Sequence, residues 1–279
     1  MRPKTILVCL TTAEQTATIL KVAVPLARKH GAHLVGLRTL EAILVYPGIA
    51  MHIPEDTFSA FRSSQNKETA EIEDIFEHHT SPEDFVSEFR VVRADTRSAT
   101  DRMIESARAA DLVIMAQDGQ DTDPRDMRQI QRDVIRECGR PVLVIPADYQ
   151  GPEIGEKIVL GWSETREAAR AAHDVLCIAE PDARLTVLSV GRTAEDLMAA
   201  DDAIAITEMF ARHGLRPTLE HRDPLGQSIA SVLSAVAFEK GADMIVTGAF
   251  GHSSTYDFVI GATSYELLRD HKVPILFSK

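Results

Sequence analysis

The chain has few of the residues that define several protein classes. Only three of its 279 residues are cysteines (Cys9, Cys138 and Cys177), and each sits in an apolar stretch. This excludes a disulfide framework and predicts reduced, structural thiols. No apolar run approaches the roughly 20 residues that cross a membrane, and the first eight residues contain no signal-peptide core. We therefore expect a cytoplasmic protein without a membrane partner.

Positive charge is also scarce. The chain has 30 Lys and Arg against 42 Asp and Glu, a net charge of −12. Residues 1–150 hold 18 basic against 23 acidic side chains, and residues 151–279 hold 12 against 19. Neither half has the basic face that a nucleic-acid partner requires. An anionic ligand would have to bind through backbone N–H groups or helix N-termini instead.

Several motifs for cofactors, metals and catalysis are missing as well. The sequence has no Gly-x-Gly-x-x-Gly and no Gly-x4-Gly-Lys-Ser/Thr, which argues against a dinucleotide fold and a P-loop. It has no Gly-x-Ser-x-Gly, and its Cys and His residues never cluster at zinc spacing. We expect no metal site, and no catalytic residue can be assigned.

The sequence does contain an internal repeat. Three segments recur in the same order: Thr5–Val8 as Lys157–Leu160, Ala110–Gly119 as Ala242–Gly251, and Arg140–Val144 as Val273–Phe277. Two copies of one unit predict two similar domains. We place them at residues 1–148 (the first copy) and 154–279 (the second copy), joined by a Pro/Gly-containing polar stretch.

Both copies alternate β-branched runs with amphipathic stretches, which predicts an α/β fold with parallel sheets. Expected strands are 4–10, 33–39, 86–93, 111–116 and 141–146, then 157–162, 184–190, 216–221, 243–248 and 273–278. Expected helices include 14–30, 95–109, 164–179, 227–239 and 265–271. Ile6 and Ile158 lie 152 positions apart whereas Gly119 and Gly251 lie 132 apart, so the first copy has 20 more residues in between. We place the insertion in 41–82, as a loop and a longer helix over 68–79 that covers a sheet edge.

The second copy has a glycine pattern between its fourth strand and last helix. Gly248, Gly251 and Gly261 precede Ala262-Thr263-Ser264. Glycine at a strand end lets backbone N–H groups turn toward a phosphate, and the following helix N-terminus favours an anion. Hydroxyl or imidazole donors complete the candidate site: His252, Ser253, Thr263 and Ser264. The alternative is that these glycines serve only tight turns and close helix–sheet packing.

The first copy has lost this pattern. Ala116 replaces the first glycine, and Gln131 stands where a hydroxyl is expected. Four carboxylates in the same loop would repel a phosphate: Asp118, Asp121, Asp123 and Asp126. A solvated acidic loop explains them better than a Mg²⁺ or Ca²⁺ site. We predict no nucleotide in the first copy.

These patterns resemble the universal stress protein family, in a tandem form. The resemblance rests on the Gly-x2-Gly-x9-Gly spacing of the second copy, on Gly251-His252-Ser253, on Val273-Pro274-Ile275-Leu276 and on the opening segment Leu160–Ala171. It implies doubly wound domains with strand order 3-2-1-4-5 and helices on both faces. It also implies that strands 141–146 and 273–278 pair antiparallel, so that one chain forms an intramolecular pseudo-dimer that could itself form a homodimer.

The resemblance also implies a function. By resemblance to the family members that bind nucleotides, the second copy is expected to bind one adenine nucleotide (ATP, ADP or AMP, with Mg²⁺ for ATP). The same resemblance implies a regulatory role in the stress response, with at most slow hydrolysis. Val190 is an adenine contact by resemblance. Ser163 stands where the family commonly has Asp, and Ala262 stands where Ser or Gly is usual, so the chain departs from the family pattern at both positions. The alternatives are an interaction module with both sites decayed and a protein partner, and an adenylating enzyme, whose Ser-Gly-Gly-x-Asp-Ser loop is absent.

Overall fold

The structure is a computed structural model that describes residues 2–41, 55–94, 97–117, 124–151, 153–191, 194–251, 262–269 and 271–279. The first copy contains β1 (Thr5–Cys9), α1 (Ala13–His30), β2 (His33–Glu41), α3 (Glu55–Thr80), β3 (Ser87–Ala94), α4 (Ala99–Ala107), β4 (Leu112–Ala116), α5 (Pro124–Glu137) and β5 (Val142–Ile145). The second copy contains β6 (Lys157–Trp162), α6 (Arg166–Asp174), η1 (Val175–Cys177), β7 (Arg184–Val190), α7 (Ala194–Arg212), β8 (Arg216–Arg222), α8 (Ile229–Lys240), β9 (Met244–Gly248), α9 (Ala262–Arg269) and β10 (Ile275–Ser278).

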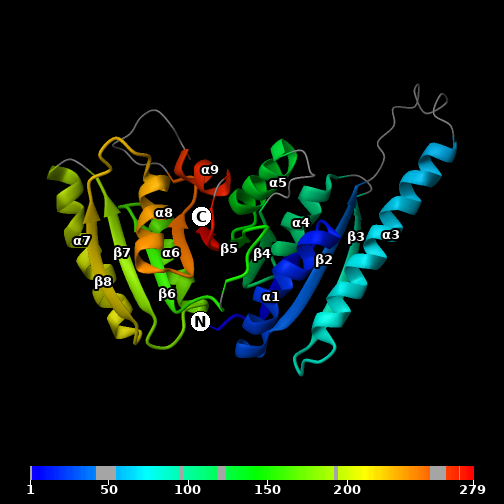
Figure 1. Cartoon of the computed structure of the whole chain (residues 1–279), viewed down its shortest axis with the longest axis horizontal. Coiled ribbons are helices and arrows are strands. Elements are labelled where there is room, and N and C mark those ends of the chain that lie inside the picture. Colours follow the sequence, from blue (N-terminus) through cyan, green and yellow to red (C-terminus); the bar gives the residue numbers. More distant parts are fainter. Residues whose placement is uncertain are drawn as a thin grey trace.

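All the described strands join one sheet, in the order β3-β2-β1-β4-β5-β10-β9-β6-β7-β8 (Figure 1). Within each copy the pairs are parallel, and the order is 3-2-1-4-5 in both, which confirms the predicted fold class. Helices cover both faces of the sheet, so the central strands are buried throughout, as parallel strands usually are.

The two copies meet through their last strands. β10 pairs antiparallel with β5, with Leu276 opposite Leu143 and Phe277 opposite Val142. All four side chains are fully buried. The pairing satisfies the backbone groups of two edges that would otherwise face solvent, and the tandem copies therefore form an intramolecular pair. Because one sheet runs through both copies, the domain limits 1–148 and 154–279 stay a prediction.

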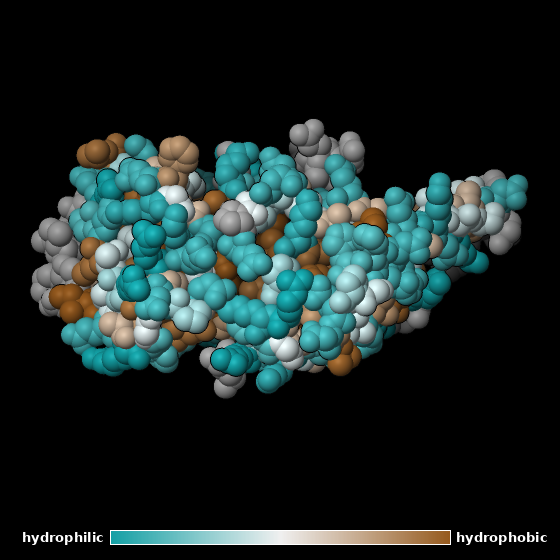
Figure 2. All heavy atoms as spheres, turned by 60° about the horizontal axis from the view of Figure 1, so that its bottom comes forward, coloured by the Kyte–Doolittle hydropathy of each residue, from teal (hydrophilic) through white to brown (hydrophobic). Residues whose placement is uncertain are grey.

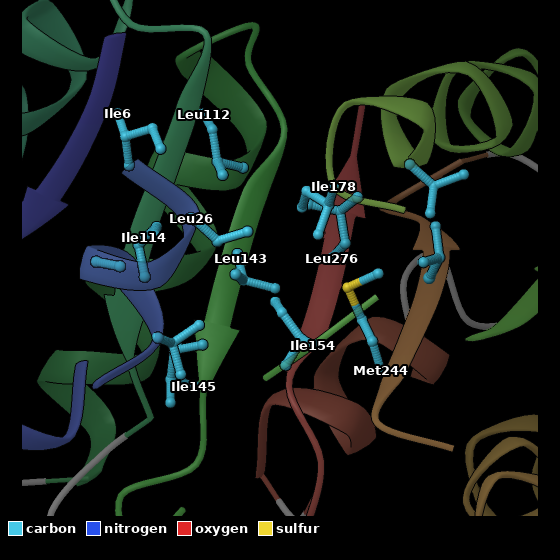
Figure 3. Close-up of a cluster of buried hydrophobic side chains, with 14 of the residues drawn as sticks. Ile6, Leu26, Leu112, Ile114, Leu143, Ile145, Ile154, Ile178, Met244 and Leu276 are labelled. Atoms are coloured by element: carbon cyan, nitrogen blue, oxygen red, sulfur yellow. The ribbon is translucent and has the colours of Figure 1, made fainter. Parts of the chain in front are cut away.

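The hydrophobic core continues from one copy into the other. On one face of the sheet a single buried cluster includes Ile6 and Leu143 from the first copy and Met244 and Leu276 from the second (Figure 3). The opposite face has its own cluster, which likewise joins Val142 to Phe277 and Ile245. The contact between the copies thus has the character of a domain interior.

Local signals explain where the helices begin. Thr12 caps α1, and Thr165 caps α6 by accepting a hydrogen bond from Ala168 N–H. Ser98 and Asp101 form a capping box, so α4 begins later than the predicted residue 95. The inserted helix α3 is longer than the predicted 68–79, packs on α1 and lies beyond β3 at one end of the sheet (Figure 1).

The surface is mostly polar in the view of Figure 2, where hydrophobic residues appear in small, separate groups. Among the described residues, no helix combines the length and the apolar character that a membrane crossing demands.

Candidate functional site

The candidate site of the second copy lies at the carboxyl edge of its strands. β6 is flanked by β7 and β9, and the carboxyl ends of these parallel strands share one edge. Ser163 follows β6, Val190 ends β7 and Gly248 ends β9. In doubly wound folds ligands bind at this edge, where the strand order reverses. The structure thus brings these three predicted residues together.

The other predicted residues divide into two groups. Ala262 and Thr263 are half-buried in the first turn of α9, and Ser264 is buried, with its Oγ accepting a hydrogen bond from Phe250 N–H at 3.3 Å. This bond ties the start of α9 to the segment 248–251, which we call the glycine loop. His252, Ser253 and Gly261 lie outside the described residues, as do Asp118, Asp121 and Asp123; the side chain of Asp126 is likewise not described.

Both described glycines of the loop make room for the start of α6. A Cβ on Gly248 would lie 2.6 Å from the backbone N of Ala168 and 2.6 Å from the carbonyl carbon of Glu167. A Cβ on Gly251 would lie 2.9 Å from Oε2 of Glu167. These separations are shorter than real Cβ contacts. The backbone of α6 therefore requires glycine at position 248, whereas a Cβ at position 251 would displace the flexible end of the Glu167 side chain. A buried carboxylate, which the sequence did not single out, therefore contacts the loop.

Phe250 holds the loop in a strained conformation. Its φ is +52°, in the left-handed region that a bulky residue seldom adopts. Its ring meets Tyr265 edge-on at 5.8 Å between centroids, and the guanidinium of Arg136 lies 5.2 Å from the ring centroid. Its carbonyl accepts a hydrogen bond from Lys279 Nζ at 3.1 Å. Such strain persists only where the surroundings fix the residue from several sides.

The first copy contributes directly to this arrangement. Arg132 and Arg136 both lie on α5, and Arg132 Nη1 donates to the hydroxyl of Tyr265 at 2.8 Å. Gln117 Nε2, just after β4, donates to the carbonyl of Arg269 at the end of α9 at 3.1 Å. None of these contacts was predicted, because they depend on how the copies face each other.

At the same edge of the first copy, side chains bridge the strand ends. Gln131, fully buried, donates from Nε2 to the carbonyl of Ala116, the residue that replaces the first glycine. Gln15, at the start of α1, donates to the carbonyl of Gln117 at 3.0 Å. Two glutamines thus tie α1 and α5 to the end of β4.

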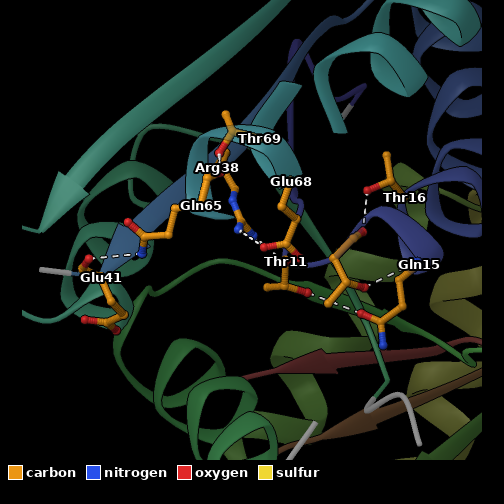
Figure 4. A network of polar contacts seen from close by, with 9 residues as sticks. Thr11, Gln15, Thr16, Arg38, Glu41, Gln65, Glu68 and Thr69 are labelled. Atoms are coloured by element: carbon orange, nitrogen blue, oxygen red, sulfur yellow. Dashed lines mark hydrogen bonds and ion pairs between the residues drawn. The ribbon is translucent and has the colours of Figure 1, made fainter. Parts of the chain in front are cut away.

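A second polar network lies beside these bridges (Figure 4). Arg38, 7% exposed on β2, pairs with Glu68 of the inserted helix at 2.6 Å and donates to the carbonyl of Thr11 after β1. Thr11 in turn contacts Gln15 at 3.2 Å. The insertion therefore supplies the counter-charge for a buried arginine at the ends of β1 and β2.

The single tryptophan lies beside the second-copy site. Trp162 ends β6, directly before Ser163, and is 9% exposed. Its indole Nε1 is buried and has no hydrogen-bond partner among the described residues. A buried donor without a partner is unusual in proteins, and this one lies at the edge where ligands bind in related architectures.

In the described part of this site, groups suited to covalent or metal chemistry do not gather. Burial raises the pKa of Cys9 to about 12 and that of Cys177 to about 12, so both thiols stay protonated. Within the described ranges, no three His, Cys, Asp or Glu side chains lie close enough together to hold a metal ion. A polar surface hollow of about 490 Å³, lined by Lys157, Arg184 and other residues, lies at the amino ends of the strands, away from the glycine loop.

Comparisons with known proteins identify the family. The sequence model of the universal stress protein family matches the chain twice, at residues 3–146 and 156–279. The chain belongs to the universal stress protein family. It is a tandem universal stress protein, as the repeat and the glycine pattern predicted. None of the curated proteins compared with the chain matches it significantly.

Solved structures agree on the fold of this universal stress protein. It is similar to a universal stress protein from Archaeoglobus fulgidus DSM 4304, with a TM-score of 0.76 and 14% identity over 98% of this chain and 96% of that one. It is also similar to a protein of unknown function from Pseudomonas aeruginosa PAO1, with a TM-score of 0.59 and 17% identity over 99% of this chain and 92% of that one. At such identities the likeness shows the fold alone.

Proposed function

We propose that this universal stress protein is a cytoplasmic regulator that binds one adenine nucleotide in its second copy. The base would lie near Val190 and Trp162, and the phosphates, with Mg²⁺ for ATP, would lie between the glycine loop and the start of α9. The protein would act through its nucleotide state and a protein partner rather than through turnover. The first copy would bind no nucleotide.

The contrast between the two copies is the observation that carries this proposal. In the first copy Gln15, at the start of α1, and Gln131, in the middle of α5, donate hydrogen bonds to the end of β4 and to the residue after it. In the second copy a glycine loop stands at this place, tied to α9 through Ser264. Backbone N–H groups at a helix start favour a phosphate. The indole N–H of Trp162, for which the described part of the chain offers no acceptor, adds a donor at the same edge.

Ligand titration with ATP, ADP and AMP tests the proposal. Trp162 is the only tryptophan, so its fluorescence reports on this site. Ligand at one hundred times its Kd would raise the free energy of unfolding by roughly 2.7 kcal/mol, seen as a higher melting temperature. If no nucleotide changes either signal, the proposal is wrong.

A charge variant with a matched control locates the site. Ala262→Asp places a carboxylate in the first turn of α9, where the helix N-terminus tolerates an acidic residue but a phosphate would be repelled. We expect nucleotide binding to be lost and the melting temperature to change little. Ala13→Asp makes the same change at the half-buried first residue of α1 in the first copy and should leave binding intact.

The alternative function, an interaction module without a nucleotide, is favoured by one observation. The carboxylate of Glu167 lies against Gly251, at the edge where a phosphate would approach. Under this alternative neither copy binds a nucleotide, and the titrations above give no signal with any of the three ligands.

A further inference from the structure

Glu167 is the second residue of α6 and is 4% exposed. Its Oε1 accepts a hydrogen bond from Arg166 Nε at 2.8 Å, while Oε2 faces the glycine loop at Gly251. The side chain of Arg166 is 84% exposed, so this partner lies on the solvent side of the carboxylate. The loop side of Glu167 therefore carries an acceptor oxygen directed at the backbone of the candidate phosphate site.

The charge of this carboxylate is retained despite its burial. Burial alone would raise the pKa of Glu167, but the bonds from Arg166 and from its own backbone N–H, with the charge of Lys279, hold that pKa below its ordinary value. The side chain is thus ionised at neutral pH. An ionised carboxylate at a buried site acts on nearby charges with little screening by salt.

The first copy shows that the fold accepts a neutral side chain in the corresponding region. There Gln15, 3% exposed at the start of α1, reaches the segment after β4 and donates to the carbonyl of Gln117. A glutamine at position 167 would keep the size of the side chain and could make a similar bond. Glu167→Gln therefore removes the charge with little change in shape.

We infer that Glu167 determines ligand specificity in the second copy, by opposing phosphate in proportion to its charge. This inference rests on the proposed function and deepens it. Repulsion between like charges grows with the charge on the ligand, so ATP is penalised more than AMP, and adenosine is not penalised. Glu167 therefore lowers the affinity for a free nucleoside triphosphate relative to the affinity for a nucleoside or a nucleoside monophosphate.

The test compares the affinities of a series of ligands that differ only in the number of phosphates. The full chain and its Glu167→Gln variant are titrated with adenosine, AMP and ATP, with and without Mg²⁺, and followed by Trp162 fluorescence and calorimetry. We expect Glu167→Gln to bind metal-free ATP about tenfold or more tightly than the unaltered chain. The gain should be smaller for AMP and for ATP with Mg²⁺, and absent for adenosine. Glu164→Gln, at an exposed carboxylate three residues earlier, is the matched control and should change none of these affinities.

Each outcome separates specificity from a structural role. A gain in affinity that grows with the number of phosphates supports the inference. The inference is also supported if the unaltered chain binds no ATP and Glu167→Gln does. Three results overturn the inference when the unaltered chain binds at least one of the ligands: Glu167→Gln changes all three affinities by the same factor, weakens ATP binding, or has no effect. In each of these cases the proposed function stands. If neither protein binds any of the three ligands, both the inference and the proposed function fail.

Discussion

The contact between Glu167 and the glycine loop can be tested without any ligand. Gly248 and Gly251 both have negative or extended φ, so alanine would fit their backbone. At such positions alanine usually stabilises a protein by about 0.4–1 kcal/mol, because it restricts the unfolded chain. Any loss of stability in Gly248→Ala or Gly251→Ala must then come from the new methyl group and the atoms it meets.

The two methyl groups meet different atoms. At Gly251 the nearest three all belong to the Glu167 side chain: Oε2 at 2.9 Å, Cδ at 3.3 Å and Cβ at 3.6 Å. At Gly248 the nearest atoms are backbone, at 2.6 Å, and these cannot move without shifting α6. Overpacking costs about 1–3 kcal/mol, so we expect about 1 kcal/mol for Gly251→Ala and about 3 kcal/mol for Gly248→Ala.

A double-mutant cycle with Glu167→Ala separates the two cases. Truncating Glu167 removes the oxygen and carbon that Gly251→Ala would strike, so the second change should become neutral or stabilising, with a coupling of about 1.5 kcal/mol. The cost of Gly248→Ala should remain, because Glu167→Ala leaves the backbone of α6 in place. The free energy of unfolding is measured in urea by circular dichroism and by Trp162 fluorescence. An equal cost of Gly251→Ala in both backgrounds would show that Glu167 does not contact the loop.

Two further predictions concern the pairing of the copies and the response to acid. Leu143→Glu buries an unpaired charge opposite Leu276 and should lower the free energy of unfolding by roughly 4 kcal/mol or more. The control Phe238→Glu, at a side chain that is 89% exposed, should change it by no more than about 0.5 kcal/mol. If small-angle scattering and urea unfolding show that the copies of Leu143→Glu remain docked, the pairing is contradicted. Burial lowers the pKa of His30 from 6.5 to about 4, so stability is retained above pH 6.5 and falls as the pH drops toward 4. Urea unfolding across this pH range should show that His30→Gln loses about 1 kcal/mol less stability than the unaltered chain, after allowance for the partial exposure of His30. Equal losses in the two proteins would show that His30 does not cause the acid response.

The sequence predicted the fold well because the fold depends on local and repeated patterns. Strands such as 157–162 and 184–190 were placed at their observed limits, since their β-branched runs end at turn residues. The order 3-2-1-4-5 and the antiparallel β5–β10 pair followed from the family resemblance and are confirmed. The length of α3 was underestimated, because its first turns carry few apolar residues to mark a buried face.

The candidate site was less predictable, because its decisive contacts join distant parts of the chain. The glycine spacing located the loop, but it could not separate a phosphate cradle from close packing. In the structure Gly248 and Gly251 pack against α6. Glu167 lay within the quoted opening segment, yet nothing in its sequence neighbourhood indicated that it would be buried. Arg136 reaches Phe250 only because the two copies face each other across one sheet.

The tandem arrangement gives the difference between the copies a physical meaning. In the first copy the edge of the sheet is closed by amide hydrogen bonds from Gln15 and Gln131. In the second copy the glycine loop contains a strained Phe250, and α5 of the first copy supplies a cation over its ring. A cation over an aromatic face contributes about 0.5–1 kcal/mol at an exposed site. This contribution offsets part of the roughly 1–3 kcal/mol that the backbone strain at Phe250 costs. Loss of the glycine pattern in one copy is therefore compatible with a retained role, in which the first copy fixes the loop of the second.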